Sequence, residues 1–156
     1  MDPDLMEIEN LSTAANRIYN SDTFPLFVSL GNVATEDDAR LLGLHSIYHL
    51  CQMVLFCPLI SFFSGRQISP ALSGESTRSY ATTITRNAIT HCQLIRQYIH
   101  RASDVTKLSP LVGFASFVST SIVVALVKSE TKRHHDRRSG RIRVSGQMLD
   151  FINDTL

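Results

Sequence analysis

The chain has 156 residues, of which 44% are hydrophobic and 19% are charged, a composition that suits one soluble domain with a substantial core. Its formal net charge of +1 combines an acidic first part, −6 over residues 1–60, with a basic remainder, +7 over residues 61–156. The acidic start Met1-Asp2-Pro3-Asp4 is unlike a secretory signal or a transit peptide, so we expect an intracellular protein. Three irregularly spaced cysteines without any Cys-x-x-Cys argue against a disulfide framework and a structural zinc site, and favour reduced thiols in a core.

The first predicted element is an amphipathic helix over residues 4–19. Its apolar residues recur at steps of three and four, as the buried face of a helix requires. They are Leu5, Ile8, Leu11, Ala15 and Ile18. Residues 20–34 are rich in turn formers, and we predict no regular element there.

A second helix is predicted to begin at Thr35, because this N-cap residue precedes three carboxylates that the helix dipole favours in a first turn. It should run to about Cys57, where Pro58 removes a backbone donor and ends or kinks it. A polar connection over residues 65–79 follows. Apolar positions at steps of four and three then predict a third helix over residues 76–101.

Residues 108–127 contain no formal charge and predict a fourth helix, with Ser109 as its N-cap and Pro110 in its first turn. Twenty such residues could also cross a bilayer, together with the uncharged residues 41–65. Imidazoles and hydroxyls in both stretches need partners that lipid does not supply and a soluble core does. We therefore favour a buried core helix, the most enclosed of the domain, in which Phe117→Asp would unfold the protein.

The tract that follows is basic, with seven Lys/Arg between residues 128 and 143. It could contact phosphate, anionic lipid or a nuclear import receptor. No aromatic residue is interleaved to stack on bases, and Ser139-Gly140 interrupts any helix. We therefore expect a solvated interhelical loop over residues 128–146. Residues 147–156 predict the start of a further amphipathic helix, so the chain is expected to be part of a larger domain.

Two segments carry a resemblance to a known family. Leu44 to Pro58 is similar to the pattern Leu-His-x-x-Tyr-His-x-Cys, followed by apolar residues and a proline, and residues 109–118 resemble the helix Ser-Pro-Phe-x-Gly-Tyr-x-x-Phe. Both patterns belong to the regulatory (middle homology) domain of fungal-specific zinc-cluster transcription factors. The resemblance covers mainly residues 35–156, and Leu111 stands where the family commonly has an aromatic. The matching residues, most of them expected in the core, are Leu44, His45, Tyr48, His49, Cys51, Pro58, Ser109, Pro110, Gly113, Phe114 and Phe117.

This resemblance implies a partial, all-α, multi-helix domain, orthogonal or bundle-like, in a nuclear regulator of RNA polymerase II transcription. The family's DNA-binding module, in which six cysteines hold two zinc ions, is not in this chain. Zinc is therefore expected only in that module, and DNA contact only through it. The implied partners are proteins of the transcription machinery or a second copy of the chain, with a small-molecule effector as a further candidate, and the implied mechanism is a change in helix packing.

Two histidine patterns allow both a chemical and a structural interpretation. His45 and His49 lie four residues apart and could share a metal, but Ser46 replaces the glutamate of the metalloprotease motif, so we expect core histidines with backbone or hydroxyl partners. His91 and Cys92 point about 100° apart on a helix, so a buried structural cysteine is expected instead of a nucleophile. With no Gly-rich phosphate loop and no nucleophile elbow, we expect no enzyme and no catalytic, cofactor or metal site. The alternative function is a small two-span helical membrane protein.

Overall fold

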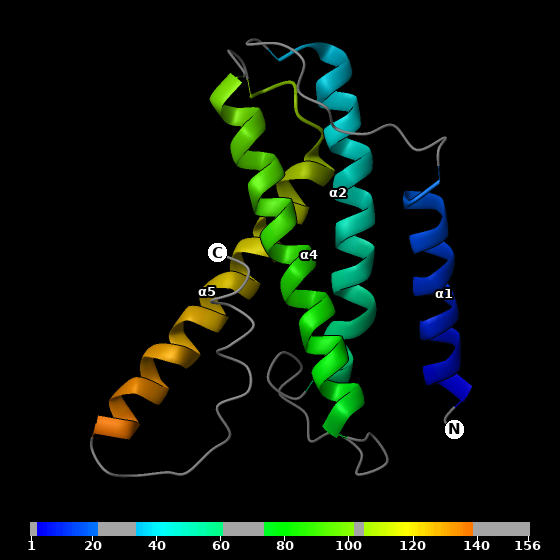
Figure 1. The fold of residues 1–156 in the computed structure, drawn as a ribbon. Helices are drawn as coiled ribbons and strands as arrows, with labels where there is room; N and C mark the ends of the chain where they lie inside the picture. Colours follow the sequence, from blue (N-terminus) through cyan, green and yellow to red (C-terminus); the bar gives the residue numbers. More distant parts are fainter. Residues whose placement is uncertain (1–2, 22–33, 61–73, 102–104, 139–156) are drawn as a thin grey trace. The chain divides into compact units, whose positions relative to one another are not determined.

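The computed structural model describes four stretches of the chain, and they contain helices and no strand (Figure 1). The described residues are 3–21, 34–60, 74–101 and 105–138. The elements are α1 (Pro3–Tyr19), α2 (Glu36–Phe56), the 3-10 turn η1 (Cys57–Leu59), α4 (Gly74–Arg101) and α5 (Pro110–Arg138). The all-α fold is thus confirmed, and so are the predicted helices over 4–19, 35–57 and 76–101. The helix predicted over 147–156 lies outside the described residues.

The chain divides into two compact units, residues 1–123 and residues 124–156, and α5 begins in the first and continues into the second. All packing described below belongs to the first unit.

The start of α2 follows directly from its sequence. The Thr35 hydroxyl accepts a hydrogen bond from the backbone N–H of Asp38 at 3.2 Å, and the Asp38 carboxylate accepts one from the backbone N–H of Thr35 at 2.8 Å. This capping box satisfies two backbone donors that a helix end otherwise leaves unpaired, and these bonds to Thr35 lower the pKa of Asp38. At the other end α2 stops at Phe56, and Pro58 lies in η1, as predicted.

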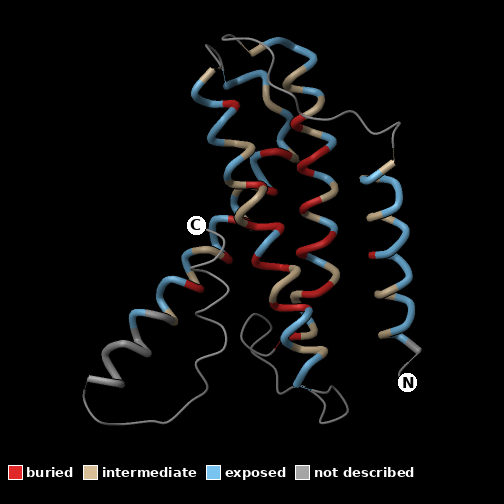
Figure 2. The backbone as a smooth tube through the Cα atoms, viewed as in Figure 1, coloured by how far each residue is buried: buried red, intermediate tan, exposed pale blue. Residues whose placement is uncertain are grey.

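The core is formed where α2 and α4 pack side by side. Buried residues follow the sides of these two helices that face one another (Figure 2). Leu42 and Met53 of α2 and Ile84 of α4 are completely buried, and the rings of Phe56 and Tyr80 stack with centroids 5.0 Å apart. The first turn of α5 joins this core through Val112, which packs in one cluster with Leu42 and Tyr98.

The packing of α1 corrects the sequence prediction. Leu11 and Ile18, which were expected in the core, are 52% and 64% exposed, whereas Ser12 is buried. The predicted residues Leu5, Ile8 and Ala15 are half-buried, but the face of α1 that meets α2 and α4 also carries polar residues, and we call its four side-chain hydrogen bonds the polar ladder. They join Glu9 to Tyr80 (2.6 Å), Ser12 to Gln52 (2.8 Å), Asn16 to Tyr48 (2.6 Å) and Tyr19 to His45 (2.9 Å).

The position of α5 also differs from the prediction. Its buried residues in the first unit form one stripe, Val112, Ala115, Ser119 and Ile122. Phe114 and Phe117 on other sides of the helix are 55% and 69% exposed. The helix carries its own apolar residues on several sides, but the part of the chain that the structure describes covers only one of these sides. The expectation that 108–127 is the most enclosed helix is therefore wrong, and so is the burial assumed for Phe117.

The basic tract is helical over the residues that the structure describes. Residues 128–138 continue α5, so the loop predicted over 128–146 is wrong for that stretch. Lys, Arg and Glu, which are common in this stretch, are good helix formers, and a solvated tract of this composition extends a helix easily. Ser139-Gly140 comes directly after the end of α5, and residues 139–146 lie outside the described residues.

Candidate functional site

The residues of the family resemblance are spread over two helices and are mostly not in the core. On α2, His45 and His49 are buried and Tyr48 is half-buried, whereas Leu44 and Cys51 are exposed. The remaining six are exposed, which corrects the expectation that the matching residues are mostly core residues. These six are Pro58, Ser109, Pro110, Gly113, Phe114 and Phe117.

His45 lies next to two tyrosines between α1 and α2. The Tyr19 hydroxyl and His45 Nδ1 are 2.9 Å apart, and the Tyr19 ring stacks on Tyr48 with centroids 3.7 Å apart. Burial raises the pKa of both phenols, so both stay protonated and can donate. Tyr48 donates to the side-chain oxygen of Asn16. A hydroxyl partner for a buried His45 agrees with the prediction.

The hydrogen bond to Asn87 determines which ring nitrogen of His49 carries the proton. The Asn87 amide nitrogen donates to the Thr83 carbonyl, so the amide oxygen faces His49 Nδ1 at 2.8 Å and accepts a hydrogen bond from its N–H. The proton of neutral His49 therefore resides on Nδ1. The buried Nε2 finds no hydrogen-bond partner within the described residues. Burial lowers the pKa of His49, which keeps the ring neutral. Its partner is thus an amide, where a backbone group or hydroxyl was expected.

His91 of α4 is the centre of this polar core and is completely buried. Its Nε2 lies 2.9 Å from the Ser46 hydroxyl of α2, and its Nδ1 lies 2.9 Å from the Ser119 hydroxyl of α5. These two contacts connect three helices through one ring. Burial is the main cause that lowers the pKa of His91 to about 4, and His49 nearby adds to it.

We call Ser46, His91 and Ser119 the serine–histidine–serine bridge. The number of protons available to the three side chains determines which of them donate hydrogen bonds. Each serine hydroxyl lies 2.7 Å from the carbonyl four residues earlier, of Leu42 or Ala115, to which it can donate. Neutral His91 has one N–H and one bare nitrogen. One serine can accept a hydrogen bond from the His91 N–H and still donate to its backbone carbonyl. The other serine must donate its hydroxyl proton to the bare nitrogen and gives up its carbonyl. Only a charged His91 would let both serines donate to the backbone, and burial opposes that charge.

The geometry of the bridge does not provide a nucleophile for a substrate. A serine within 3 Å of a histidine is the pair that covalent catalysis uses. Here Ser46 and Ser119 are both completely buried, so no substrate can reach either hydroxyl. Within the described residues no group of three His, Cys, Asp or Glu could hold a metal ion. Within the described residues the bridge connects α2, α4 and α5 in the core.

The cysteines are free, and they are less buried than predicted. Cys51 is exposed, which corrects the expectation of a core thiol, while Cys57 and Cys92 are half-buried. Burial raises the pKa of Cys57 and Cys92, so both remain thiols at neutral pH and are weak nucleophiles.

Sequence reasoning missed the central role of His91. The bridge joins residues 45 and 28 positions apart, and neither serine differs in its local sequence from an ordinary helical serine. One signal was available: a histidine that occupies the apolar face of an amphipathic helix needs a polar partner on a neighbouring helix.

Comparison with known proteins adds no relative. No family model, no curated protein and no solved structure matches the chain.

Proposed function

We propose that this chain is a regulatory, non-catalytic helical domain of a fungal nuclear transcription regulator, related to the regulatory domain of zinc-cluster factors. The observation that supports this most is that the two helices that carry the resemblance, α2 and α5, both contact the same residue of the helix between them. Ser46 lies in the first segment and Ser119 directly follows the second, and both contact His91 of the helix between them. The order of the segments and the intervening helix therefore correspond to one packing unit.

Such a domain would act through protein contacts. DNA binding and zinc would belong to a separate module, and the partners would be proteins of the transcription machinery or a second copy. The exposed apolar side of α5, with Phe114 and Phe117, is the surface best suited to such contacts, because large exposed aromatic side chains are typical of protein interfaces.

The direct test is a reporter assay in which the chain is brought to a promoter. Residues 1–156 are fused to a heterologous DNA-binding domain in yeast, with a reporter of intermediate basal expression that responds to activation and to repression. We expect at least a threefold change relative to the DNA-binding domain alone, and loss of the change in Ala115→Asp, which breaks the core. A nuclear, well-expressed fusion that leaves the reporter unchanged would contradict the proposal.

A second candidate, the two-span membrane protein, is favoured by the apolar character of two helices. Within the described residues, Glu36–Leu59 and Pro110–Ser129 are long and apolar enough to cross a bilayer by length and composition alone. Less than half of each window is buried.

The partner of α2 argues against a span. α4 packs beside α2, and its exposed Arg86 precedes Asn87, which contacts His49 near the middle of α2. A spanning α2 would place this guanidinium in hydrocarbon, where charged side chains are costly. We therefore expect the chain to leave the membrane fraction on an alkaline wash. Retention with lipid would replace the proposed function by this second candidate.

A further inference from the structure

A groove lies between the first three turns of α2 and the segment that leads into α5. Its volume is about 890 Å³, within the range typical of small-molecule sites. The α2 side extends from Glu36 to Ile47, a rise of roughly 16 Å at 1.5 Å per residue. Lys107, Ser109 and Leu111 form the other side, and Tyr98 of α4 contributes to the lining.

Much of the groove is apolar. Leu44 and Ile47 line it and are 45% and 43% exposed, so both offer apolar surface to a ligand in the groove. Between them and the start of α2 lies Gly43, where an added Cβ would meet no atom within 4 Å. The α2 wall is therefore recessed at Gly43, and a bulky apolar group can lie against it.

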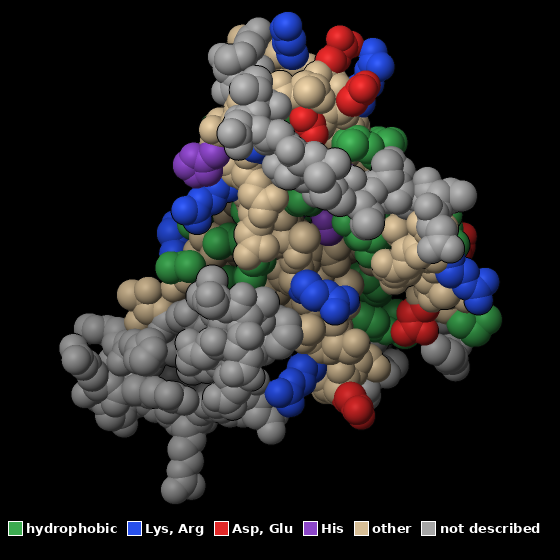
Figure 3. All heavy atoms as spheres, turned by 45° about the horizontal axis from the view of Figure 1, so that its top comes forward, with side chains coloured by type: hydrophobic (Ala, Val, Ile, Leu, Met, Phe, Trp, Pro, Cys, Tyr) green, Lys and Arg blue, Asp and Glu red, His purple; other side chains and the backbone are tan. Residues whose placement is uncertain are grey.

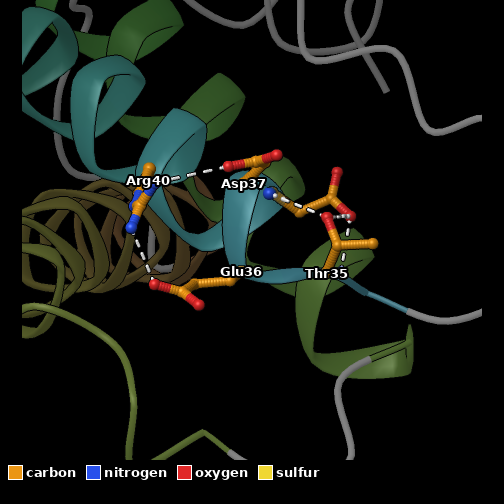
Figure 4. Close-up of polar contacts among 5 residues, drawn as sticks. Thr35, Glu36, Asp37 and Arg40 are labelled. Carbon is orange, nitrogen blue, oxygen red and sulfur yellow. Dashed lines mark hydrogen bonds and ion pairs between the residues drawn. The ribbon is translucent and has the colours of Figure 1, made fainter.

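The side of the groove opposite α2 carries a positive charge, that of Lys107. On the α2 side, Arg40 forms ion pairs with Glu36 at 2.8 Å and with Asp37 at 3.5 Å (Figure 4). The charge of Arg40 is thus balanced within α2, and the space-filling view shows acidic and basic side chains close together on the surface (Figure 3). Lys107 is exposed and takes part in neither pair.

The start of α5 adds to this preference for an anion. Ser109 and Leu111 of the first turn line the groove on the same side as Lys107, so the positive end of the helix dipole lies on that side. The groove therefore combines a long apolar surface with one cationic side chain that is in neither ion pair.

We propose that this groove binds an amphipathic monocarboxylate with a linear hydrocarbon body. The hydrocarbon would lie along Leu44 and Ile47 over Gly43, and the carboxylate would pair with Lys107. A single unpaired cation matches a single negative charge, and a wall of roughly 16 Å matches an extended chain better than a compact ring system. This inference does not depend on the proposed function.

The probe is dodecanoate, below its micelle concentration, titrated into the full chain by calorimetry. We expect saturable binding of one molecule per chain, and at least tenfold weaker binding of dodecyltrimethylammonium, which has the opposite charge. Lys107→Gln should weaken dodecanoate about tenfold and leave dodecanol unchanged, because only the carboxylate uses the ammonium.

Two matched glycine variants locate the site. Gly43→Phe fills the recess and should abolish binding, whereas Gly113→Phe adds the same side chain on α5, outside the groove lining and also in open space, and should leave binding unchanged. Circular dichroism and thermal melting check that each variant is folded. If Gly43→Phe does not fold, Gly43→Leu is used in its place.

Three outcomes would overturn the proposal. Equal binding of the cationic amphiphile would show that charge plays no part. Unchanged binding in a folded Gly43→Phe or Gly43→Leu variant would place the amphiphile elsewhere, for example on the exposed side of α5. A wild-type dimer in light scattering that Gly43→Phe dissociates, with no dodecanoate binding, would make the groove an interface between two copies. None of these outcomes affects the reporter assay, so the two proposals fail separately.

Discussion

His91 is the residue whose environment most constrains the molecule, because it contacts a hydroxyl from each of two other helices while completely buried. Removing either hydroxyl leaves a buried nitrogen unpaired, and such a loss costs about 1–3 kcal/mol. The bridge accordingly allows two predictions at the scale of single residues.

The first prediction concerns Ser119. Ser119→Ala should lower the free energy of unfolding in urea by about 1–3 kcal/mol, because His91 Nδ1 then has no partner in the bridge. Ser116→Ala is the matched control, since Ser116 also bonds the carbonyl four residues earlier, that of Val112, but does not contact His91 in the bridge. Equal losses in the two variants would mean that the bridge contributes no stability.

The second prediction concerns pH. The pKa of His91 falls to about 4 in the folded chain, below the roughly 6.5 expected when unfolded. A depressed pKa of a base means that its contribution to stability is complete above pH 6.5 and is lost as the pH falls toward 4. The loss amounts to roughly 3 kcal/mol, and the lowered pKa of His49 acts in the same direction.

The measurement is the urea midpoint between pH 7.5 and pH 4 in the wild type and in His91→Gln, which retains a donor and an acceptor. The variant should lose much less stability over this interval. Asp38 does not confuse the comparison, because its lowered pKa affects stability only below about pH 4 and is common to both proteins. Parallel pH profiles would show that His91 does not titrate with unfolding.

At the scale of elements, α1 differs from the other helices in the interactions that attach it to the rest of the domain. It contacts α2 and α4 through the polar ladder, while Leu11 and Ile18 face outward. Hydrogen bonds contribute about 0.5–1.5 kcal/mol each, and apolar burial contributes most of the stability of packed helices. A helix attached in this way should detach before the pair α2 and α4 separates.

Amide hydrogen exchange tests this expectation. We predict that protection in α1 is at least tenfold lower than in α4, and that Tyr48→Phe, which removes the bond to Asn16, lowers it further in α1 alone. Thr82→Ala on the exposed side of α4 is the control for loss of a hydroxyl. Equal protection of α1 and α4 would show that they unfold as one unit.

At the scale of the whole molecule, the exposed apolar side of α5 should govern association. Phe117 is 69% exposed, so Phe117→Asp should change the free energy of unfolding by less than about 1 kcal/mol, contrary to the expectation from sequence. Ala115, two residues earlier, is completely buried, and Ala115→Asp should unfold the chain because it buries an unpaired charge.

Light scattering over a range of concentrations completes this test. The wild type should associate as its concentration rises, and Phe117→Asp should stay monomeric, because the charge interrupts the apolar surface. Unfolding of Phe117→Asp would instead show that residue 117 is packed in the native molecule.

The local elements follow from the sequence because their signals are local. Thr35 with its three following carboxylates, Pro58, and Ser109 with Pro110 each act on backbone groups within one or two turns, so the ends they predict are found in the structure. The length of the helix that starts at Pro110 was underestimated, since a change from apolar to charged composition does not by itself stop a helix.

The sequence by itself thus determined that the chain is helical and where three of its four described helices begin and end. For α1 and α5 only the tertiary structure decided which side is buried, whereas in α4 the apolar positions Tyr80, Ile84 and Ala88, at steps of four, are buried as their periodicity predicts. Periodicity shows that a helix has an apolar face, but burial depends on which neighbours cover that face. For α1 the neighbours offer Tyr48, Gln52 and Tyr80, so its polar side faces them. For α5 the neighbours cover one stripe, and His91 unites residues that no local pattern relates.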